Sequence, residues 1–145
     1  MKIVGFETEQ GLRLGVVEGD RVVDMQAVDP DLPADLGEWL SRNGGDLARL
    51  ADLARRAPAA AHRPLAGLKF ALPVARPGKI ICLGLNYLEH AREGGHQKLP
   101  DFPTIFMRCR TSLVPHGSPI VRPTVSETLD YEAELVAIIG RRAKH

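Results

Sequence analysis

Hydrophobic and polar residues alternate over the first part of the chain in a pattern that predicts three short β-strands. The predicted strands cover residues 2–8, 12–18 and 21–24. Alternation places the apolar side chains on one face of each strand and the polar ones on the other. Gly19 and Asp20 separate the second strand from the third, and glycine at the first central position favours a type II′ hairpin turn. We therefore expect a β-meander with a structural role.

The next part of the chain has helical rather than strand spacing. Leu36, Trp39 and Leu40 fall on one side of a short predicted helix, which the Asn-Gly-Gly sequence at residues 43–45 breaks. Asp46 could cap a second helix. The apolar stripe of that second helix consists of Leu47, Leu50, Leu53, Ala54 and Ala57. A leucine stripe of this kind indicates core packing rather than a ligand site.

Residues 58–78 are rich in alanine and proline and contain four prolines, so they cannot sustain a helix. We place a domain boundary in this stretch. The predicted organisation is a small N-terminal domain of residues 1–72 and a second domain of residues 73–145.

The second half of the chain contains further apolar stretches. Residues 79–83 predict a short buried strand, and residues 104–108 and 120–122 predict two more. Residues 129–140 end in an apolar, partly β-branched run that predicts another buried strand. A strand that is apolar on both faces needs neighbours on both sides. Few residues follow this one, so we expect the chain to be the N-terminal part of a longer protein.

Two acidic residues, Glu132 and Glu134, lie at the start of that last strand. Residues two apart in a strand point to the same face, so the two carboxylates would repel each other. A hard divalent cation would relieve this repulsion, because such cations prefer oxygen ligands. The alternative is a solvated strand end whose acids lie near Arg122, Arg141 or Arg142.

A short helix predicted at residues 88–93 carries His90 and Glu93, and Gly94 and Gly95 end it. Residues three apart on a helix share a face and can touch. A carboxylate beside an imidazole fixes its tautomer and makes it a better base. The alternative is an incidental pair on a surface helix. The glycines at both ends of the segment also suit a mobile lid.

Arg108 ends the predicted strand at residues 104–108. Its planar guanidinium could bind an anionic substrate. It could equally lie at the edge of a sheet without contacting a ligand.

Composition narrows the functional classes. The formal net charge is +1 and aromatic residues make up 5% of the chain, which argues against a nucleic-acid partner. No apolar stretch is long enough to span a bilayer, so no membrane partner is expected. The two cysteines, Cys82 and Cys109, do not form a disulfide framework and indicate reduced thiols in a cytoplasmic protein.

Three blocks occur together and in order along the second half of the chain. They are residues 79–87 (KIICLGLNY) with His90 and Glu93, residues 103–108 (PTIFMR), and residues 129–135 (LDYEAEL). In this combination the chain closely resembles the fumarylacetoacetate hydrolase family. The N-terminal part resembles the small N-terminal domain of bacterial two-domain members.

The resemblance implies a fold and a site. The implied fold class is α+β and β-rich, with a small N-terminal β-meander and helix domain followed by the first part of a mixed β-roll. Family members bind Mg²⁺, Mn²⁺ or Ca²⁺ through carboxylates, which makes Glu132 and Glu134 metal ligands and Mg²⁺ the expected ion. His90 and Glu93 match the family's catalytic pair.

The substrate contacts and the third metal ligand follow from the same resemblance. Asn86, Tyr87 and Arg108 become substrate-binding residues, although many members have lysine where Arg108 stands. The third metal ligand of the family, an aspartate, is expected beyond residue 145.

The implied activity is metal-dependent hydrolysis of a carbon–carbon bond in an acylpyruvate-like oxo acid, through a metal-bound enolate and a water activated by His90 and Glu93. Decarboxylation, isomerisation or dehydration of oxo or sugar acids is the alternative within the family. An inactive fragment that serves as a binding or assembly module is the alternative of another class. A homodimer is expected from the resemblance alone.

Overall fold

The computed structural model describes residues 1–144. The fold is α+β and rich in β-structure, as the sequence predicts. The chain divides into two compact units. Residues 1–75 and residues 114 onward form one, which we call the sheet unit, and residues 76–113 form the other, which we call the ribbon unit. The division into domains at residues 1–72 and 73–145 stays a prediction.

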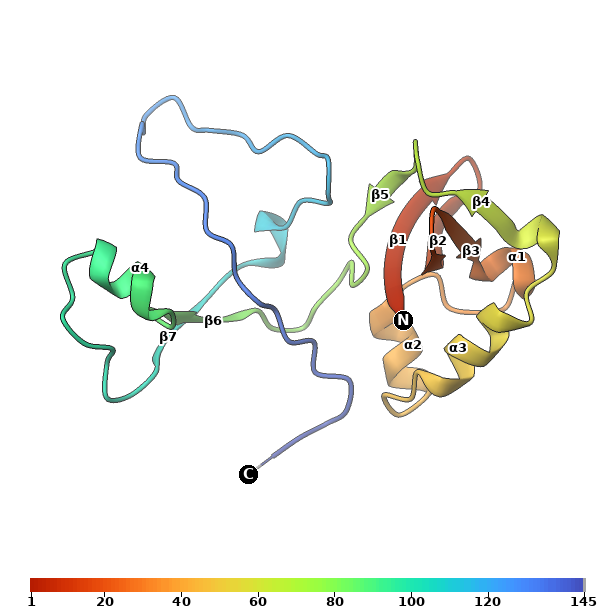
Figure 1. Cartoon of the computed structure of the whole chain (residues 1–145), viewed down its shortest axis with the longest axis horizontal. Coiled ribbons are helices and arrows are strands. Elements are labelled where there is room, and N and C mark those ends of the chain that lie inside the picture. Colours follow the sequence, from red (N-terminus) through yellow and green to blue (C-terminus); the bar gives the residue numbers. More distant parts are fainter. Residues whose placement is uncertain (145) are drawn as a thin grey trace. The chain divides into compact units, whose positions relative to one another are not determined.

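The sheet unit is built on a five-stranded antiparallel sheet with the strand order β4-β3-β2-β1-β5 (Figure 1). Its strands are β1 (Lys2–Thr8), β2 (Gly11–Glu18), β3 (Arg21–Asp24), β4 (His62–Pro64) and β5 (Lys69–Ala71). The predicted meander is therefore confirmed. Gly19 has a φ of 61°, as the first central residue of a type II′ turn requires.

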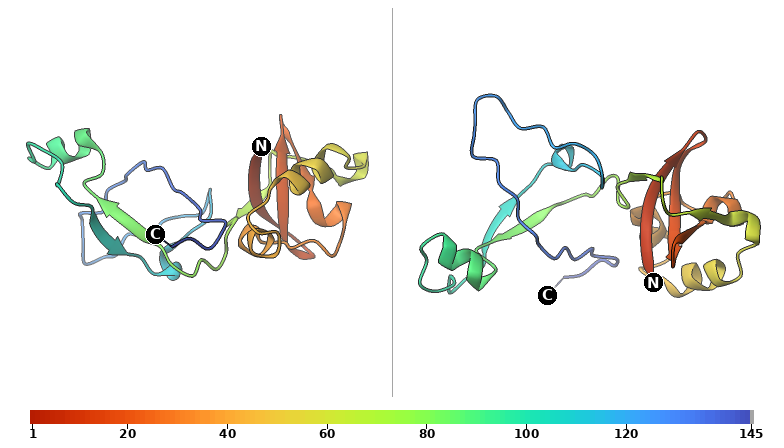
Figure 2. Two further views of the ribbon diagram at one scale, coloured as in Figure 1. Left: turned by 90° about the horizontal axis from the view of Figure 1, so that it is seen from below. Right: turned by 45° about the horizontal axis from the view of Figure 1, so that its top comes forward.

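Three helices follow β3: α1 (Met25–Val28), α2 (Leu36–Arg42) and α3 (Ala48–Arg55). They pack against the sheet, as Figure 2 shows. The core contains Leu14 and Val16 from β2 together with Trp39 and Leu50 from the helices. The predicted leucine stripe is confirmed, because Leu50 and Ala54 are buried and Leu47, Leu53 and Ala57 pack around them. Asp46 accepts a hydrogen bond of 2.8 Å from the backbone N–H of Ala48, and Leu47 is the N-cap residue. A 3₁₀ turn at Ala59–Ala61 leads into β4.

The ribbon unit contains two antiparallel strands, β6 (Ile81–Gly84) and β7 (Thr104–Met107), joined through helix α4 (Leu88–Glu93). A 3₁₀ turn at Arg110–Ser112 follows β7. β7 falls within its predicted range, and β6 overlaps its predicted range but ends one residue later, at Gly84. The predicted burial of residues 79–83 is wrong, since Ile81 and Leu83 are exposed. A two-stranded ribbon has no second layer in its own unit to cover its apolar side chains.

Two predicted strands do not form among the described residues. Residues 120–122 and residues 129–140 have no strand pairing. Leu135 is 90% exposed and Val136 is 79% exposed, so the prediction of a buried strand over residues 129–140 is wrong for this structure. The apolar pattern persists, but a strand needs a partner to receive its backbone hydrogen bonds, and these residues have none of the sheet pairings seen elsewhere in the described chain.

Among the described residues, the longest helices have eight residues or fewer, and none is long and apolar enough to cross a membrane.

Candidate functional site

A backbone turn between β6 and α4 positions the first candidate residues. Leu85 adopts a φ of 53°, and it is the only non-glycine residue with a positive φ in the described chain. This left-handed conformation is costly for an L-residue and redirects the chain sharply. Asn86 and Tyr87 follow, and Tyr87 is the N-cap residue of α4. Two of the three predicted substrate contacts therefore lie at the start of the helix that carries His90.

The other end of α4 closes with a Schellman motif. Gly95 has a φ of 82°, its N–H donates to the carbonyl of Arg92 at 2.9 Å, and the N–H of His96 donates to the carbonyl of Ala91 at 2.8 Å. Glycine suits this position because it adopts a positive φ without steric cost. The glycine pair predicted to end the helix is confirmed in this role.

His90 and Glu93 lie side by side on α4. Nδ1 of His90 is 4.0 Å from Oε2 of Glu93. That separation is longer than a hydrogen bond, although catalytic pairs often tighten only when a substrate binds. The side chains are 46% and 79% exposed, respectively. Ala91, which lies between them in sequence, is fully buried. The structure therefore presents a His–Glu pair on the exposed side of α4, opposite a buried alanine.

Arg108 lies at the opposite end of the β6–β7 ribbon. Gly84 pairs with Thr104 at the end near α4, whereas the N–H of Arg108 donates to the carbonyl of Ile80 at 3.1 Å. Four residues of strand separate these ends, which corresponds to about 13 Å. Within the ribbon unit, Arg108 is therefore not brought beside His90 as a shared substrate site requires.

The surroundings of Arg108 are basic. Its guanidinium lies 5.5 Å from the centroid of the Phe106 ring, a cation–π distance. It lines a groove of about 390 Å³ together with Lys79 and Arg110, and none of the residues that line this groove is acidic. Such a groove favours an anion.

The predicted metal ligands lie in the sheet unit, on the exposed segment after residue 127. Glu132 and Glu134 supply oxygen donors of the kind that Mg²⁺ prefers, and Mg²⁺ is often held by one or two carboxylates with water completing the shell. The donor chemistry therefore fits a hard cation. No group of three or more His, Cys, Asp or Glu side chains that could hold a metal ion occurs within residues 1–144.

Two features of the site had no signal in the sequence. The left-handed backbone of Leu85 was not predicted, because leucine has no preference for that conformation. The basic groove was also missed, since it depends on strand register placing residue 108 opposite residue 80.

Comparison with known proteins agrees with these motifs. Residues 79–145 match the model of the fumarylacetoacetate (FAA) hydrolase C-terminal domain. The match begins two residues before β6 and includes β6, α4, β7 and the segment that carries both glutamates. Residues 79–145 therefore belong to the fumarylacetoacetate hydrolase family.

Several similar proteins are named as enzymes or by their domain. Over its whole length the chain is 37% identical to the mitochondrial oxaloacetate tautomerase Fahd2a of Rattus norvegicus and 34% identical to the corresponding FAHD2A of Homo sapiens. It is also 34% identical, over 94% of its length, to a fumarylacetoacetate hydrolase domain-containing protein 2 homologue of Dictyostelium discoideum. The chain spans 47%, 46% and 44% of these relatives, respectively.

A solved structure supports the fold. A Mycobacterium smegmatis protein assigned as HpcE is similar to this chain with a TM-score of 0.56 and 28% sequence identity. The similarity covers 77% of this chain and 37% of that one. The family assignment therefore stands on sequence and on fold.

Proposed function

We propose that this protein acts in proton transfer on a small oxo acid, with keto–enol tautomerisation of oxaloacetate as the first candidate reaction. Two kinds of support meet here. Relatives that are 34–37% identical over the whole chain are named oxaloacetate tautomerases. The observation that carries the proposal is the pair His90 and Glu93, 4.0 Å apart on α4, because the reaction needs one base beside the substrate.

The proposed role of His90 is to accept the proton from the carbon between the ketone and the far carboxylate of oxaloacetate. The electron pair of the broken C–H bond forms the C=C bond of the enol, and the carbonyl oxygen receives a proton. The proposed role of Glu93 is to orient the imidazole. One proton leaves carbon and one arrives at oxygen, so the reaction balances without another reactant.

In this proposal Glu132 and Glu134 hold a divalent cation, with Mg²⁺ as the first choice and Mn²⁺ or Ca²⁺ as alternatives. When bound, such a cation supplies a Lewis acid that polarises the carbonyl of the oxo acid. The two carboxylates supply oxygen donors and two negative charges, which suit a hard cation. Without a bound cation, the same charges would repel an anionic substrate.

Asn86 and Tyr87 are the proposed substrate contacts near the pair, because they precede α4 directly. Arg108 is proposed to bind a carboxylate through its planar fork. Its place at the far end of the ribbon means that it contacts the same small substrate only if the ribbon unit rearranges.

Hydrolysis of a carbon–carbon bond is the second candidate. The exposure of His90 favours it, because an imidazole open to solvent can take a proton from water. The resulting hydroxide would attack a carbonyl carbon of an acylpyruvate. The C–C bond would then break, and its electron pair would remain on the departing enolate until a proton reaches it.

The two reactions are separated by substrate. Tautomerisation is followed through the ultraviolet absorbance of the oxaloacetate enol, and hydrolysis through loss of an acylpyruvate and release of pyruvate. We expect the first rate to exceed the second in the presence of Mg²⁺. His90→Asn should lower the rate of whichever reaction the protein catalyses about 10²-fold or more, which is the usual scale of general base catalysis. His96→Asn is the matched control, since His96 follows the same helix and should leave the rate unchanged.

If neither reaction occurs with any of the three cations, the proposal is wrong and a binding or assembly module becomes the better description.

A homodimer is also proposed, and light scattering tests it. The cytoplasmic location stays a prediction, which a fluorescent fusion in the source cell would check.

A further inference from the structure

The segment that carries Glu132 and Glu134 contacts the rest of the sheet unit at its far end. Among residues 127–144 only Gly140 is not exposed. A Cβ atom on Gly140 would lie 3.3 Å from Cδ2 of Leu40 and 3.5 Å from Cα of Gly45. Gly140 therefore packs against the turn between α2 and α3.

The contact is also close when it is measured from Gly45. A Cβ atom on Gly45 would lie 2.7 Å from Cγ of Arg141 and 3.0 Å from the carbonyl oxygen of Gly140. Real Cβ contacts at these distances require one partner to move. A Cβ at residue 45 would therefore crowd the backbone of Gly140, whereas a Cβ at residue 140 would meet the Leu40 side chain first.

The turn that receives Gly140 is held firmly. The N–H of Gly45 donates to the carbonyl of Leu40 at 2.8 Å, and the N–H of Asp46 donates to the carbonyl of Asn43 at 3.0 Å. The indole N–H of Trp39, a buried core residue, donates to the carbonyl of Asp46 at 2.9 Å. The turn is thus tied to the core and can act as a fixed platform.

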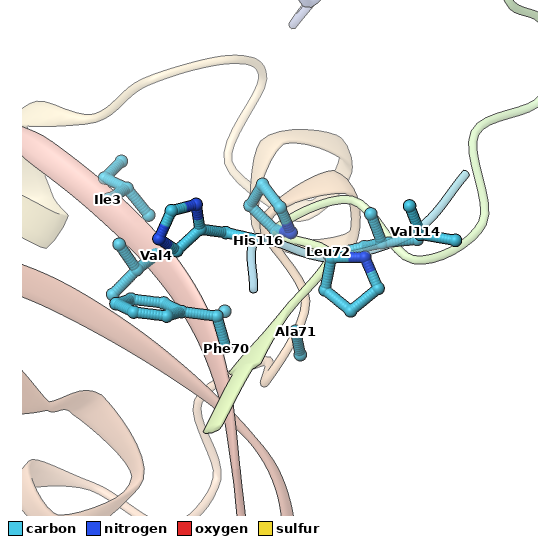
Figure 3. Close-up of a pocket in the computed structure, with 10 residues that line it drawn as sticks. Ile3, Val4, Phe70, Ala71, Leu72, Val114 and His116 are labelled. Atoms are coloured by element: carbon cyan, nitrogen blue, oxygen red, sulfur yellow. The ribbon is translucent and has the colours of Figure 1, made fainter. Parts of the chain in front are cut away.

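The segment that carries Glu132 and Glu134 also contacts the β-sheet upstream of the two glutamates, at His116. The ring of His116 meets the ring of Phe70 on β5 edge to face, with centroids 5.2 Å apart. Figure 3 shows His116 beside Phe70 and Val4, in a pocket of about 370 Å³ that Val114 also lines. Residues 117–139, which carry both glutamates, are therefore bounded by two contacts with the β-sheet and helices of the sheet unit.

We propose that Gly45 is a positioning residue for the metal-binding segment. The α2–α3 turn contacts Gly140 and so restricts where the five residues between Glu134 and Gly140 can run. Restricting a segment before it binds a cation lowers the entropy that binding must remove. The metal part of this inference rests on the proposed function, whereas the contact itself does not.

The contact is tested by solution NMR on the whole protein. Wild type should show nuclear Overhauser effects between the Leu40 methyl groups and the Hα atoms of Gly140. Gly45→Ala should abolish them. Gly44→Ala is the matched control, since Gly44 lies in the same turn with a φ of 58° but a Cβ there would meet nothing within 4 Å. If Gly45→Ala keeps the effects, or if wild type lacks them, the contact is refuted.

A second pair of variants distinguishes loss of the contact from misfolding of the α2–α3 turn. Gly140→Val changes the contact from the other partner, where no positive φ is involved. Ala137→Val is its control, because Ala137 is exposed. Gly140→Val should abolish the effects and leave the buried signals of Trp39 unchanged.

Mn²⁺ titration tests the consequence. Gly45→Ala and Gly140→Val should weaken Mn²⁺ binding about tenfold, the scale seen when residues that orient metal ligands are changed. The controls Gly44→Ala and Ala137→Val should bind as wild type does. Unchanged affinity in the contact variants refutes the positioning role.

The double variant Glu132→Gln with Glu134→Gln separates the two proposals. If it binds Mn²⁺ as wild type does, the proposed metal site is wrong, whatever the contact variants show.

Discussion

The carboxylate of Asp24 accepts a hydrogen bond of 3.0 Å from Nε of Arg63, although 39 residues separate them in the chain. Asp24 is fully buried, and its other oxygen accepts hydrogen bonds from the backbone N–H groups of Gln26 and Ala27. Arg13 lies 3.9 Å away and adds a second positive charge. A single side chain thus caps α1 and ties it to β2 and β4.

Asp24→Ala should destabilise the sheet unit by about 2–4 kcal/mol, because it removes a helix cap and leaves two arginines without their buried partner. Urea unfolding followed by the fluorescence of the buried Trp39 measures the change. Asp31→Ala, at an exposed loop position, should stay within about 0.5 kcal/mol of wild type. Equal losses in both variants would show that the buried pair contributes nothing.

Leu50→Ala should cost about 2–5 kcal/mol, since Leu50 is fully buried and its removal leaves a cavity in the core. Arg49→Ala, on the exposed side of the same helix, should change the stability little. The free energy of unfolding in urea distinguishes the two variants. A small loss for Leu50→Ala would mean that the helices do not pack on the sheet as described.

Leu85→Gly should preserve α4, because glycine adopts the required positive φ without the cost of about 1 kcal/mol that leucine bears. Leu85→Val should weaken the helix, since a β-branched side chain tolerates this conformation least. Hydrogen exchange of the Ala91 N–H, which donates to the carbonyl of Tyr87 at 3.0 Å, reports on the first turn of α4. Faster exchange in the glycine variant than in the valine variant would contradict the conformation at residue 85.

Glu132→Gln and Glu134→Gln should each weaken Mn²⁺ or Mg²⁺ binding and abolish any activity that needs the cation, because each removes a charged oxygen donor. Isothermal titration calorimetry measures the affinity. Glu127→Gln is the control, as it removes the same charge from the same exposed segment. If all three variants bind alike, the two glutamates are ordinary surface acids.

A substantial part of the fold followed from local pattern. The meander of β1, β2 and β3 was predicted because alternation and the Gly19-Asp20 turn are local signals. The leucine stripe of α3 and the glycine end of α4 were predicted for the same reason, since helix period and helix capping depend on residues a few positions apart.

The candidate residues divide in the same way. His90 and Glu93 are neighbours in the structure because three-residue spacing on a helix guarantees it. The family resemblance implies that Arg108 binds substrate, which stays a prediction, and the register of β6 and β7 places Arg108 at the end of the ribbon away from α4. Register is decided by pairing between distant segments, which no local pattern contains.

The sequence by itself determined the resemblance of residues 79–145 to the fumarylacetoacetate hydrolase family, the helix that carries the His–Glu pair, and the chemical character of Glu132 and Glu134. Motifs and side-chain chemistry depend on the identity of individual residues and need no tertiary contact. Only the tertiary structure decided that residues 129–140 run exposed rather than as a buried strand, and that Gly140 meets Gly45 across 95 residues of chain. Strand formation and close backbone approach both require a partner from elsewhere in the molecule. Their energies come from pairing and packing, which exist only once the chain has folded.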